Sequence, residues 1–274
     1  KNYMKLNYIL EQGHYKEYKG ESSYELIEKF GAILILVLCL AFHISKKNYL
    51  ESFNPQIQLR FVTLLQHYDY FIHEFIKPNC LITQYCSIQS LQILSLALQY
   101  CLVTGDTASC YELRGRVISM AQQLRLHRCP AAVLGLSGNK EGDIDLQNFM
   151  QGERRILFWC IYCLDVYSSL NLGIPRLFKD YEIECAMPFC GKSDDYDDVN
   201  QEDNVNILIV NNTKLSIVGK VSKMALSVML YSKVLANILD SIYSRFDNTN
   251  IHKKALQRDR MLDCWRRELP PDLK

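Results

Sequence analysis

Apolar residues recur at intervals of three and four along most of the chain, and the strict alternation typical of strands is almost absent. This spacing puts apolar side chains on one face of a helix, so it predicts a series of amphipathic helices. The expected helices cover residues 24–45, 55–77, 88–101, 109–124, 146–172, 213–242 and 256–265. The predicted fold class is therefore all-α: a multi-helix bundle of stacked helical hairpins around a central buried helix.

The predicted central helix is apolar on every side between Ile156 and Leu164, where the sequence reads ILFWCIYCL. A helix that is apolar all round is buried all round, so we expect Trp159 and its neighbours to lie at the centre of the domain. Two arginines, Arg154 and Arg155, precede this block. We expect them to form ion pairs near the start of the helix rather than to bind a ligand.

Asp165 is the lone acid that follows this block, and a buried carboxylate is strongly destabilising unless it is paired or hydrogen-bonded. Its candidate partners are Arg176, the backbone amides of the Gly173-Ile174-Pro175 turn, and an arginine from another helix. We expect Asp165 to fix that turn against the central helix, and contact with an effector is the alternative. Gly173 permits a backbone conformation that a side chain would block, and Pro175 stiffens the turn.

Residues 88–124 predict a helical hairpin broken at a glycine. Ser109 and Glu112 have the spacing of a capping box, in which each side chain accepts a hydrogen bond from an otherwise unpaired backbone amide. The second helix is therefore expected to begin at Ser109. Its apolar stripe faces the core, and Arg114 is expected mainly on the opposite, polar side.

The stretch 217–242 carries apolar residues at alternating intervals of four and three. Such a seam packs along its length against one partner helix. We favour a partner inside the bundle, and a homodimeric coiled coil is the alternative. A final helix follows and carries Trp265 before the segment Leu269-Pro270-Pro271.

The apolar run Ala32–Phe42 is too short to cross a bilayer, which takes about 20 residues. Lysines flank the run closely on both sides. We therefore predict a buried helix there and no association with a membrane.

Composition is that of an ordinary globular protein, with 49% hydrophobic and 22% charged residues. The formal net charge of +1 lacks the basic excess of a nucleic-acid-binding domain, so we do not expect this chain to contact DNA itself. The 11 cysteines, an odd number without a secretory signal, indicate reduced intracellular thiols.

We expect a single all-helical domain over residues 1–274 and, because the first residue is Lys1 rather than Met, a fragment of a longer protein. An insertion at about 190–212 is expected to interrupt the domain. Its core, residues 193–203, contains six acidic residues in eleven and no apolar periodicity, so it is predicted to be solvated or disordered.

Sequence motifs of enzymes and metal sites are missing. Cys160-x-x-Cys163 lacks the second cysteine pair that a structural zinc site usually needs. There is no glycine-rich phosphate-binding loop and no Gly-x-Ser-x-Gly motif. We therefore predict that the chain is not an enzyme and carries no cofactor or metal; an all-helical enzyme would need convergent polar residues in a cleft.

Segment 151–188 contains, in order, two arginines, an aromatic–Trp pair, Asp165, a Gly-x-Pro turn and a terminal proline. This order resembles the middle homology region of fungal binuclear zinc-cluster (Zn2Cys6) transcription factors. The matching residues are Arg154, Arg155, Phe158, Trp159, Asp165, Gly173, Pro175 and Pro188. Weaker agreement extends the resemblance over about 24–270.

The resemblance implies the regulatory region of a nuclear transcription factor that controls transcription by RNA polymerase II. Members of the family contact DNA through an N-terminal cluster of six cysteines on two zinc ions, and they dimerise through a coiled coil. The six-cysteine pattern does not occur in this chain. Zinc and DNA are therefore expected only in the missing N-terminal part of the parent protein, with transcriptional co-regulators as further partners.

In some members of the family this region binds a small effector. We expect an effector pocket between helices, lined by Phe158 and Tyr162 of the central helix and by the 217–242 seam. The alternative is a scaffold domain that assembles a DNA-bound protein complex without a ligand and has no internal pocket.

Overall fold

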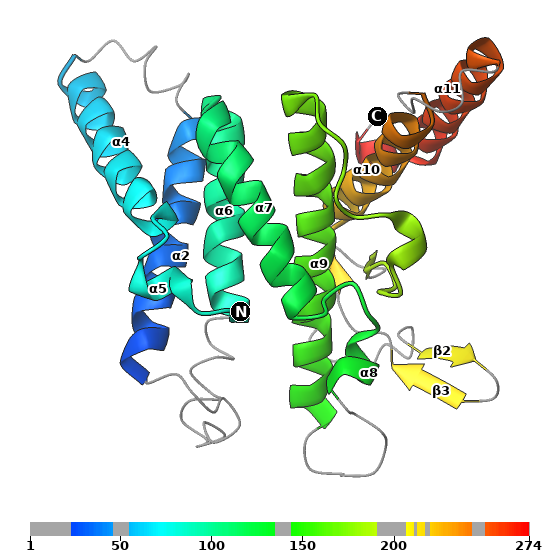
Figure 1. Ribbon diagram of the computed structural model, residues 1–274, viewed down its shortest axis with the longest axis horizontal. Coiled ribbons are helices and arrows are strands. Elements are labelled where there is room, and N and C mark those ends of the chain that lie inside the picture. The colour runs from blue at the N-terminus through cyan, green and yellow to red at the C-terminus, as the bar shows by residue number, and fades with distance from the viewer. Residues whose placement is uncertain are drawn as a thin grey trace. The chain divides into compact units, whose positions relative to one another are not determined.

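The computed structural model describes residues 23–45, 55–134, 144–190, 207–210, 213–216, 220–242 and 250–273. In these ranges the chain forms nine α-helices and four short strands, so the predicted all-α class is confirmed (Figure 1). We expected one domain over 1–274. The helices group into two compact units, Lys1–Tyr85 and Cys86–Lys274, and we describe each by itself.

The first unit is built from α2 (Ser23–Ile44), α4 (Pro55–Ile76) and the short α5 (Leu81–Gln84). Helix α2 packs against α4, and α5 contacts both. Phe42 of α2 lies edge-on to Phe61 of α4, with 5.8 Å between the ring centroids. The bounds of α2 and α4 agree with the helices predicted from the apolar spacing at 24–45 and 55–77.

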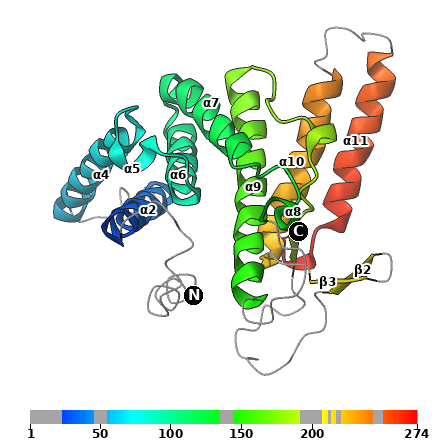
Figure 2. The ribbon, with the colours of Figure 1, turned by 60° about the horizontal axis from the view of Figure 1, so that its bottom comes forward.

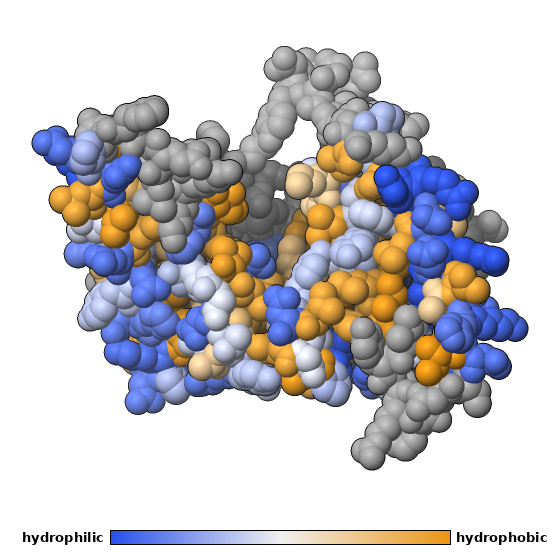
Figure 3. Space-filling model, turned by 90° about the horizontal axis from the view of Figure 1, so that it is seen from above, coloured by the Kyte–Doolittle hydropathy of each residue, from blue (hydrophilic) through white to orange (hydrophobic). Residues whose placement is uncertain are grey.

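The apolar run of α2 is buried on one face only. Leu36 and Cys39 are fully buried, whereas Leu34 is 54% and Val37 is 47% exposed. By length and composition the segment Glu25–Ile44 could cross a membrane, and 22% of it is buried in the structure. The prediction of a buried helix is thus correct for one face and wrong for the other, because among the described residues of this unit α2 packs against α4 and α5 alone. Figure 3 shows hydrophobic patches interspersed with hydrophilic residues on the surface seen from above.

The second unit begins with a helical hairpin, α6 (Ile88–Thr104) and α7 (Thr107–Gln123). Gly105 ends α6 in the left-handed conformation, with φ of 79°. The side chain of Asp106 then caps α7 by accepting a hydrogen bond from the backbone amide of Ser109. The predicted capping box was wrong, because an aspartate cap three residues earlier already satisfies that amide.

Helix α9 (Ile144–Leu172) lies at the centre of the second unit and contacts α6, α7, α10 (Lys223–Ile242) and the short α8 (Pro130–Leu134) (Figures 1 and 2). Its middle is mostly buried as the sequence predicted; within the apolar block Ile156 and Cys163 are half-buried and Cys160 is exposed. A 29-residue helix with neighbours on several sides provides the frame on which the other helices are placed.

Four short strands lie between α9 and α10. Strand β1 (Phe189–Cys190) pairs in parallel with β4 (Lys220–Val221), and β2 (Ile207–Val210) pairs antiparallel with β3 (Thr213–Ser216). The β2–β3 hairpin is drawn at the edge of the second unit in Figures 1 and 2. The acidic core 193–203 lies outside the described residues.

The long helix predicted from Thr213 begins at Lys223 instead, so the prediction was wrong for residues 213–216 and 220–222. Residues 207–210 read Ile-Leu-Ile-Val, a short run rich in β-branched residues, and Asn211-Asn212 separate it from Thr-Lys-Leu-Ser at 213–216. That arrangement favours a hairpin over a helix start.

Helix α10 and the final helix, α11 (Ile251–Glu268), form an antiparallel pair (Figure 2). Trp265 of α11 donates from Nε1 to the backbone oxygen of Ser227 at 3.0 Å. The single packing seam predicted for 217–242 is not continuous, since Met224 is 65% exposed while Leu235 is buried. Helix α10 divides its contacts between α9 and α11, and Met229 and Ala236 are buried although they lie off the predicted seam.

Candidate functional site

The site is organised by a buried ion pair between Asp165 of α9 and Arg114 of α7. Nη2 of Arg114 lies 2.6 Å and Nε 3.1 Å from Oδ1 of Asp165. The two side chains are 5% and 0% exposed. Charged groups so far from water are stable only when their remaining hydrogen bonds are also made, and here they are.

Those remaining bonds attach the turn after α9 to the two helices. Oδ2 of Asp165 accepts from the backbone amides of Leu177 at 3.0 Å and Phe178 at 2.9 Å. Nη2 of Arg114 also donates to the backbone oxygen of Pro175 at 2.8 Å. The turn itself needs Gly173, whose φ is 65°. Of the three partners predicted for Asp165, the arginine from another helix is found, and the backbone amides that bond it are those of Leu177 and Phe178, just after the Gly173-Ile174-Pro175 turn rather than within it.

The third predicted partner, Arg176, belongs to a separate network. Its guanidinium is 1% exposed and pairs with Asp240 of α10 at 2.5 Å and with Asp180 at 3.3 Å. It also donates to the hydroxyl of Tyr162 at 3.2 Å. Burial would raise the pKa of Asp240, but the hydrogen bond and positive charge of Arg176, with help from Lys179, lower that pKa below its usual value. Arg176 thus ties the segment after α9 to α10.

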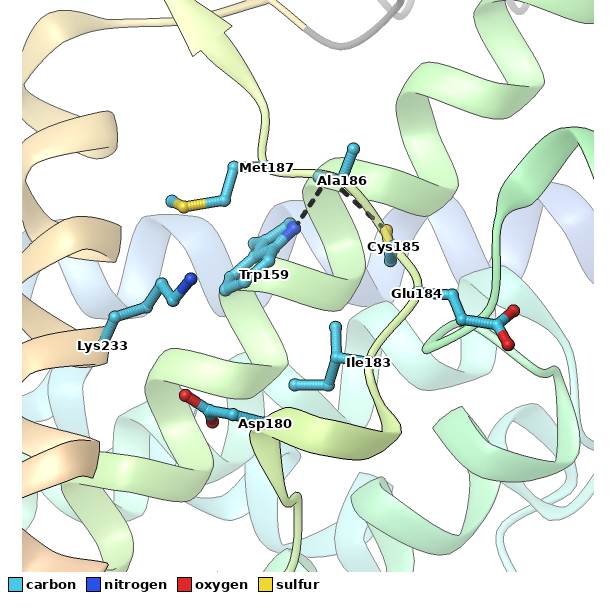
Figure 4. A pocket seen from close by; sticks show the side chains of 8 residues that line it. All are labelled: Trp159, Asp180, Ile183, Glu184, Cys185, Ala186, Met187 and Lys233. Carbon is cyan, nitrogen blue, oxygen red and sulfur yellow. Dashed lines mark hydrogen bonds between the residues drawn. The ribbon is translucent and has the colours of Figure 1, made fainter.

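Trp159 forms one wall of a pocket between α9, α10 and the segment 180–187 (Figure 4). Its Nε1 donates to the backbone oxygen of Ala186 at 2.9 Å, which fixes the plane of the indole. The ammonium of Lys233 on α10 lies 5.7 Å from the centre of the indole ring. The cavity measures about 250 Å³, and its lining side chains include Trp159, Asp180, Ile183, Glu184, Met187 and Lys233.

Phe158 and Tyr162, predicted to line an effector pocket, are completely buried and do not line this one. They support it from inside the protein. The ring of Phe158 meets Trp159 edge-on with 5.5 Å between centroids, and the ring of Tyr162 lies 5.1 Å from Trp159. Burial, with the nearby Asp180 carboxylate, raises the pKa of the Tyr162 phenol, which donates to Asp180 at 2.8 Å.

The remaining motif residues have structural surroundings. Arg154 donates a hydrogen bond to the backbone oxygen of Leu124, where α7 ends. Arg155 is 8% exposed, and Pro188 is buried at the end of the segment that forms the pocket wall. Both arginines therefore lie at packed positions on α9, consistent with a role in positioning helices.

Sequence reasoning missed two functional positions. Arg114 was placed on the polar side of its helix, but it is 4% exposed and faces α9. Its spacing of three from Val117 and seven from Ala121, both buried, was a signal that it shares their face. Lys233 had no such signal, because only the packing of α10 on α9 brings it to Trp159.

The described residues contain no group of three or more His, Cys, Asp or Glu side chains that could bind a metal ion. Cys160 and Cys163 lie on α9 without further ligands of that kind around them. What remains is a small pocket with an aromatic wall, one lysine, and two charged networks that join α7, α9 and α10. Such a site is suited to binding and to transmitting a change in helix packing.

The comparisons with known proteins agree with this picture of a regulatory helical domain. The chain belongs to the fungal specific transcription factor domain family, which it matches over residues 3–267. Transcription regulators, not enzymes, make up this class, and the chain is accordingly not an enzyme.

Individual relatives point the same way. The chain is 45% identical over 190 residues to the regulatory protein CAT8 of Saccharomyces cerevisiae, an alignment covering 67% of this chain and 12% of that protein. It is 25% identical over 188 residues to the transcriptional activator protein acu-15 of Neurospora crassa, covering 68% and 18% respectively. The chain therefore spans less than a fifth of either relative. No solved structure matches it significantly.

Proposed function

We propose that this domain senses a small effector and thereby controls the activity of a nuclear transcription factor acting on RNA polymerase II genes. The observation that carries the proposal is the position of Trp159, which lines the pocket and also packs against Phe158 in the core. Trp159 is 3% exposed, so a ligand in the pocket reaches only a small part of the indole, and through it bears directly on the centre of the domain. Support at the level of the family comes from the match over residues 3–267.

The effect of a ligand would pass to α10. Lys233 and Asp240 attach this helix to the α9 region, one at the pocket and one at Arg176. A ligand that binds the ammonium of Lys233 would replace its contact with the Trp159 indole. Helix α10 would then favour a different position relative to α9. An effector shifts such an equilibrium only by its difference in affinity for the two positions. Helix α11 moves with α10, because Nε1 of Trp265 on α11 donates a hydrogen bond to the backbone oxygen of Ser227 on α10.

Contacts outside this chain complete the proposal. The resemblance to zinc-cluster factors assigns zinc and DNA binding to a part of the parent protein beyond these 274 residues. Co-regulators and a second copy of the protein are further proposed partners. In this scheme the domain reports the presence of the effector to those parts through its helix packing.

A scaffold that binds no effector is the second candidate, and the exposed apolar faces of α2 and α4 favour it. On α4, for example, Leu59 is 70% and Tyr70 is 63% exposed. Apolar surface of this kind is typical of sites where another protein binds. A scaffold would hold its partners there and would leave the Trp159 pocket without a role.

A thermal-shift screen of metabolites with the full chain separates the two candidates. A ligand that binds only the folded state raises the melting temperature, by an amount that grows with its concentration relative to Kd. We expect at least one hit whose effect is lost in Trp159→Phe but kept in Trp265→Phe, the matched control at the other tryptophan. If no hit depends on Trp159, the sensing function at this pocket is wrong and the scaffold is favoured.

A further inference from the structure

We propose that the Trp159 pocket selects small organic anions, namely carboxylates with a compact apolar body, and that Lys233 is the residue that recognises the carboxylate. This inference rests on the proposed sensing function and specifies its ligand. It follows from three features of the pocket: its charge, its lining and its size.

The charge of the pocket is set by Lys233. Glu184 pairs with Arg128, and in Figure 4 its carboxylate points away from the other lining side chains. Asp180 accepts hydrogen bonds from Arg176 and Tyr162. Both lining carboxylates are thereby compensated by partners outside the cavity.

The surrounding ion pairs balance as well. Asp180 and Asp240 carry two negative charges, and Arg176 and Lys179, which pair with them, carry two positive charges. Among the described residues Lys233 takes part in no ion pair, and its ammonium contacts only the face of the Trp159 indole. Counted over the lining side chains and the ion-pair partners named here, the charge is +1, and the exposed Glu182 of the same segment stands outside this count. Lys233 is the lining cation that no carboxylate among the described residues pairs with, so it is the group that attracts an anion.

The ammonium of Lys233 is also free to change partner. A cation–π contact at an exposed position contributes only about 0.5–1 kcal/mol. The side chain of Lys233 is exposed, and Figure 4 shows its ammonium directed at the indole from the α10 side. A carboxylate placed between the ammonium and the ring edge forms a charge-assisted hydrogen bond, which is stronger than the contact it replaces.

The rest of the lining fits the body of such a ligand. The indole of Trp159, 3% exposed, forms part of the wall, and Ile183 and Met187 provide apolar side chains on either side of it (Figure 4). Met187 is flexible and polarisable, so it adapts to bodies of different shape.

Size restricts the ligand further. The cavity of about 250 Å³ lies below the range of about 300–1,000 Å³ that is usual for drug-sized ligands. An apolar cavity of about 150 Å³ is enough for benzene. A benzoate or a short fatty acid fits, whereas coenzyme-sized molecules do not.

The test compares ligands that differ in charge alone. Benzoate, neutral benzamide and cationic benzylamine are titrated into the Trp265→Phe chain, in which Trp159 is the only source of tryptophan fluorescence. Hexanoate and hexanamide provide the same comparison with a linear body. We expect each carboxylate to bind at least tenfold more tightly than its amide, and benzylamine not to bind measurably.

Two variants then test whether Lys233 is the positive charge that binds the carboxylate. Lys233→Gln should weaken benzoate binding by about tenfold, the effect of losing one charge-assisted contact, and should leave the weak binding of benzamide unchanged. Lys253→Gln, at an exposed lysine of α11, is the matched control and should change neither. Any one of three results would overturn the proposal. The carboxylate and its amide bind equally well, neither carboxylate binds, or Lys233→Gln leaves the affinity for benzoate unchanged.

The two proposals fail separately. If both carboxylates fail here while the metabolite screen yields a ligand that depends on Trp159, the sensing function stands and the choice of an anion is wrong. If the screen also yields nothing that depends on Trp159, the sensing function and the anion proposal are both wrong.

Discussion

Replacing Asp165 by Ala should destabilise the second unit by about 3 kcal/mol. The carboxylate accepts hydrogen bonds from two nitrogens of Arg114 and from the amides of Leu177 and Phe178. Removing one partner of a buried ion pair typically costs about 3–5 kcal/mol, because the other charge stays buried. We expect the lower end, since Arg114 keeps its hydrogen bonds to Ser169 and to the backbone oxygen of Pro175.

Urea unfolding followed by tryptophan fluorescence measures this free energy. Both tryptophans, Trp159 and Trp265, belong to the second unit, so the signal reports on the unit that contains Asp165. The difference in midpoint, multiplied by the slope m, gives the change in the free energy of unfolding. Asp259→Ala, at an exposed aspartate of α11, is the control and should change that free energy by less than about 0.5 kcal/mol.

A double-mutant cycle tests the cause. Arg114→Met alone should also be destabilising, because it leaves the Asp165 carboxylate buried with its two amide partners only. The double variant removes both charges, so its free energy of unfolding should exceed the value expected from adding the two single effects, by at least about 1 kcal/mol. A loss below about 1 kcal/mol in Asp165→Ala, or strict additivity, would refute the reasoning.

Three further changes test other parts of the network. The lowered pKa of Asp240 means that its pairing with Arg176 stabilises the fold above the unfolded pKa of about 3.9 and is lost as the pH falls below it. Asp240→Asn should therefore flatten the fall in urea midpoint between about pH 5 and pH 3. Burial raises the pKa of Glu153, so the stability it contributes is present at low pH and is lost as the pH rises through that pKa. Glu153→Gln should raise the urea midpoint at pH 7 but not at pH 4. Gly173→Ala should cost about 1 kcal/mol, because φ is 65° there although the space for a methyl group is open.

Each of these has a clear contrary result. An unchanged pH profile in Asp240→Asn would mean that its ion pair is fully screened by solvent, as many half-exposed pairs are. A lower midpoint of Glu153→Gln at pH 7 would mean that the carboxylate is stabilised by its neighbours more than it is penalised by burial. A neutral Gly173→Ala would show that the turn can adopt a different backbone conformation.

Local patterns predicted the local structure well. The helix that carries Trp159 and the helix that begins at Ile88 follow from apolar spacing, which short stretches of sequence contain in full. The need of Asp165 for partners followed from the cost of burying a charge. Its actual partner, Arg114, lies 51 positions away, and the only sequence signal was its place on the buried face of α7.

The charged networks could not be predicted in the same way. Arg176 and Asp240 are separated by 64 positions, and their pairing depends on how α10 is placed on α9. The start of α10 was itself misjudged, because the apolar run with spacings of four and three, which begins at Ile217, continues through the short strand β4. Without the correct start of that helix and its division of contacts between two neighbours, neither Asp240 nor Lys233 could be assigned a place.

The spacing of Lys233 and Asp240 suggests how a pocket this small could influence the whole unit. Seven positions separate them, so they lie on one face of α10, about 10 Å apart along its axis. Asp240 is held by two cationic partners, Arg176 and Lys179, whereas Lys233 is held by a single contact with an indole. A ligand that takes Lys233 away from Trp159 would therefore release the weaker attachment first and leave the stronger one as a pivot. The N-terminal part of α10, which lies beyond Lys233 from Asp240 and whose Ser227 accepts the hydrogen bond of Trp265, would move most, and α11 with it.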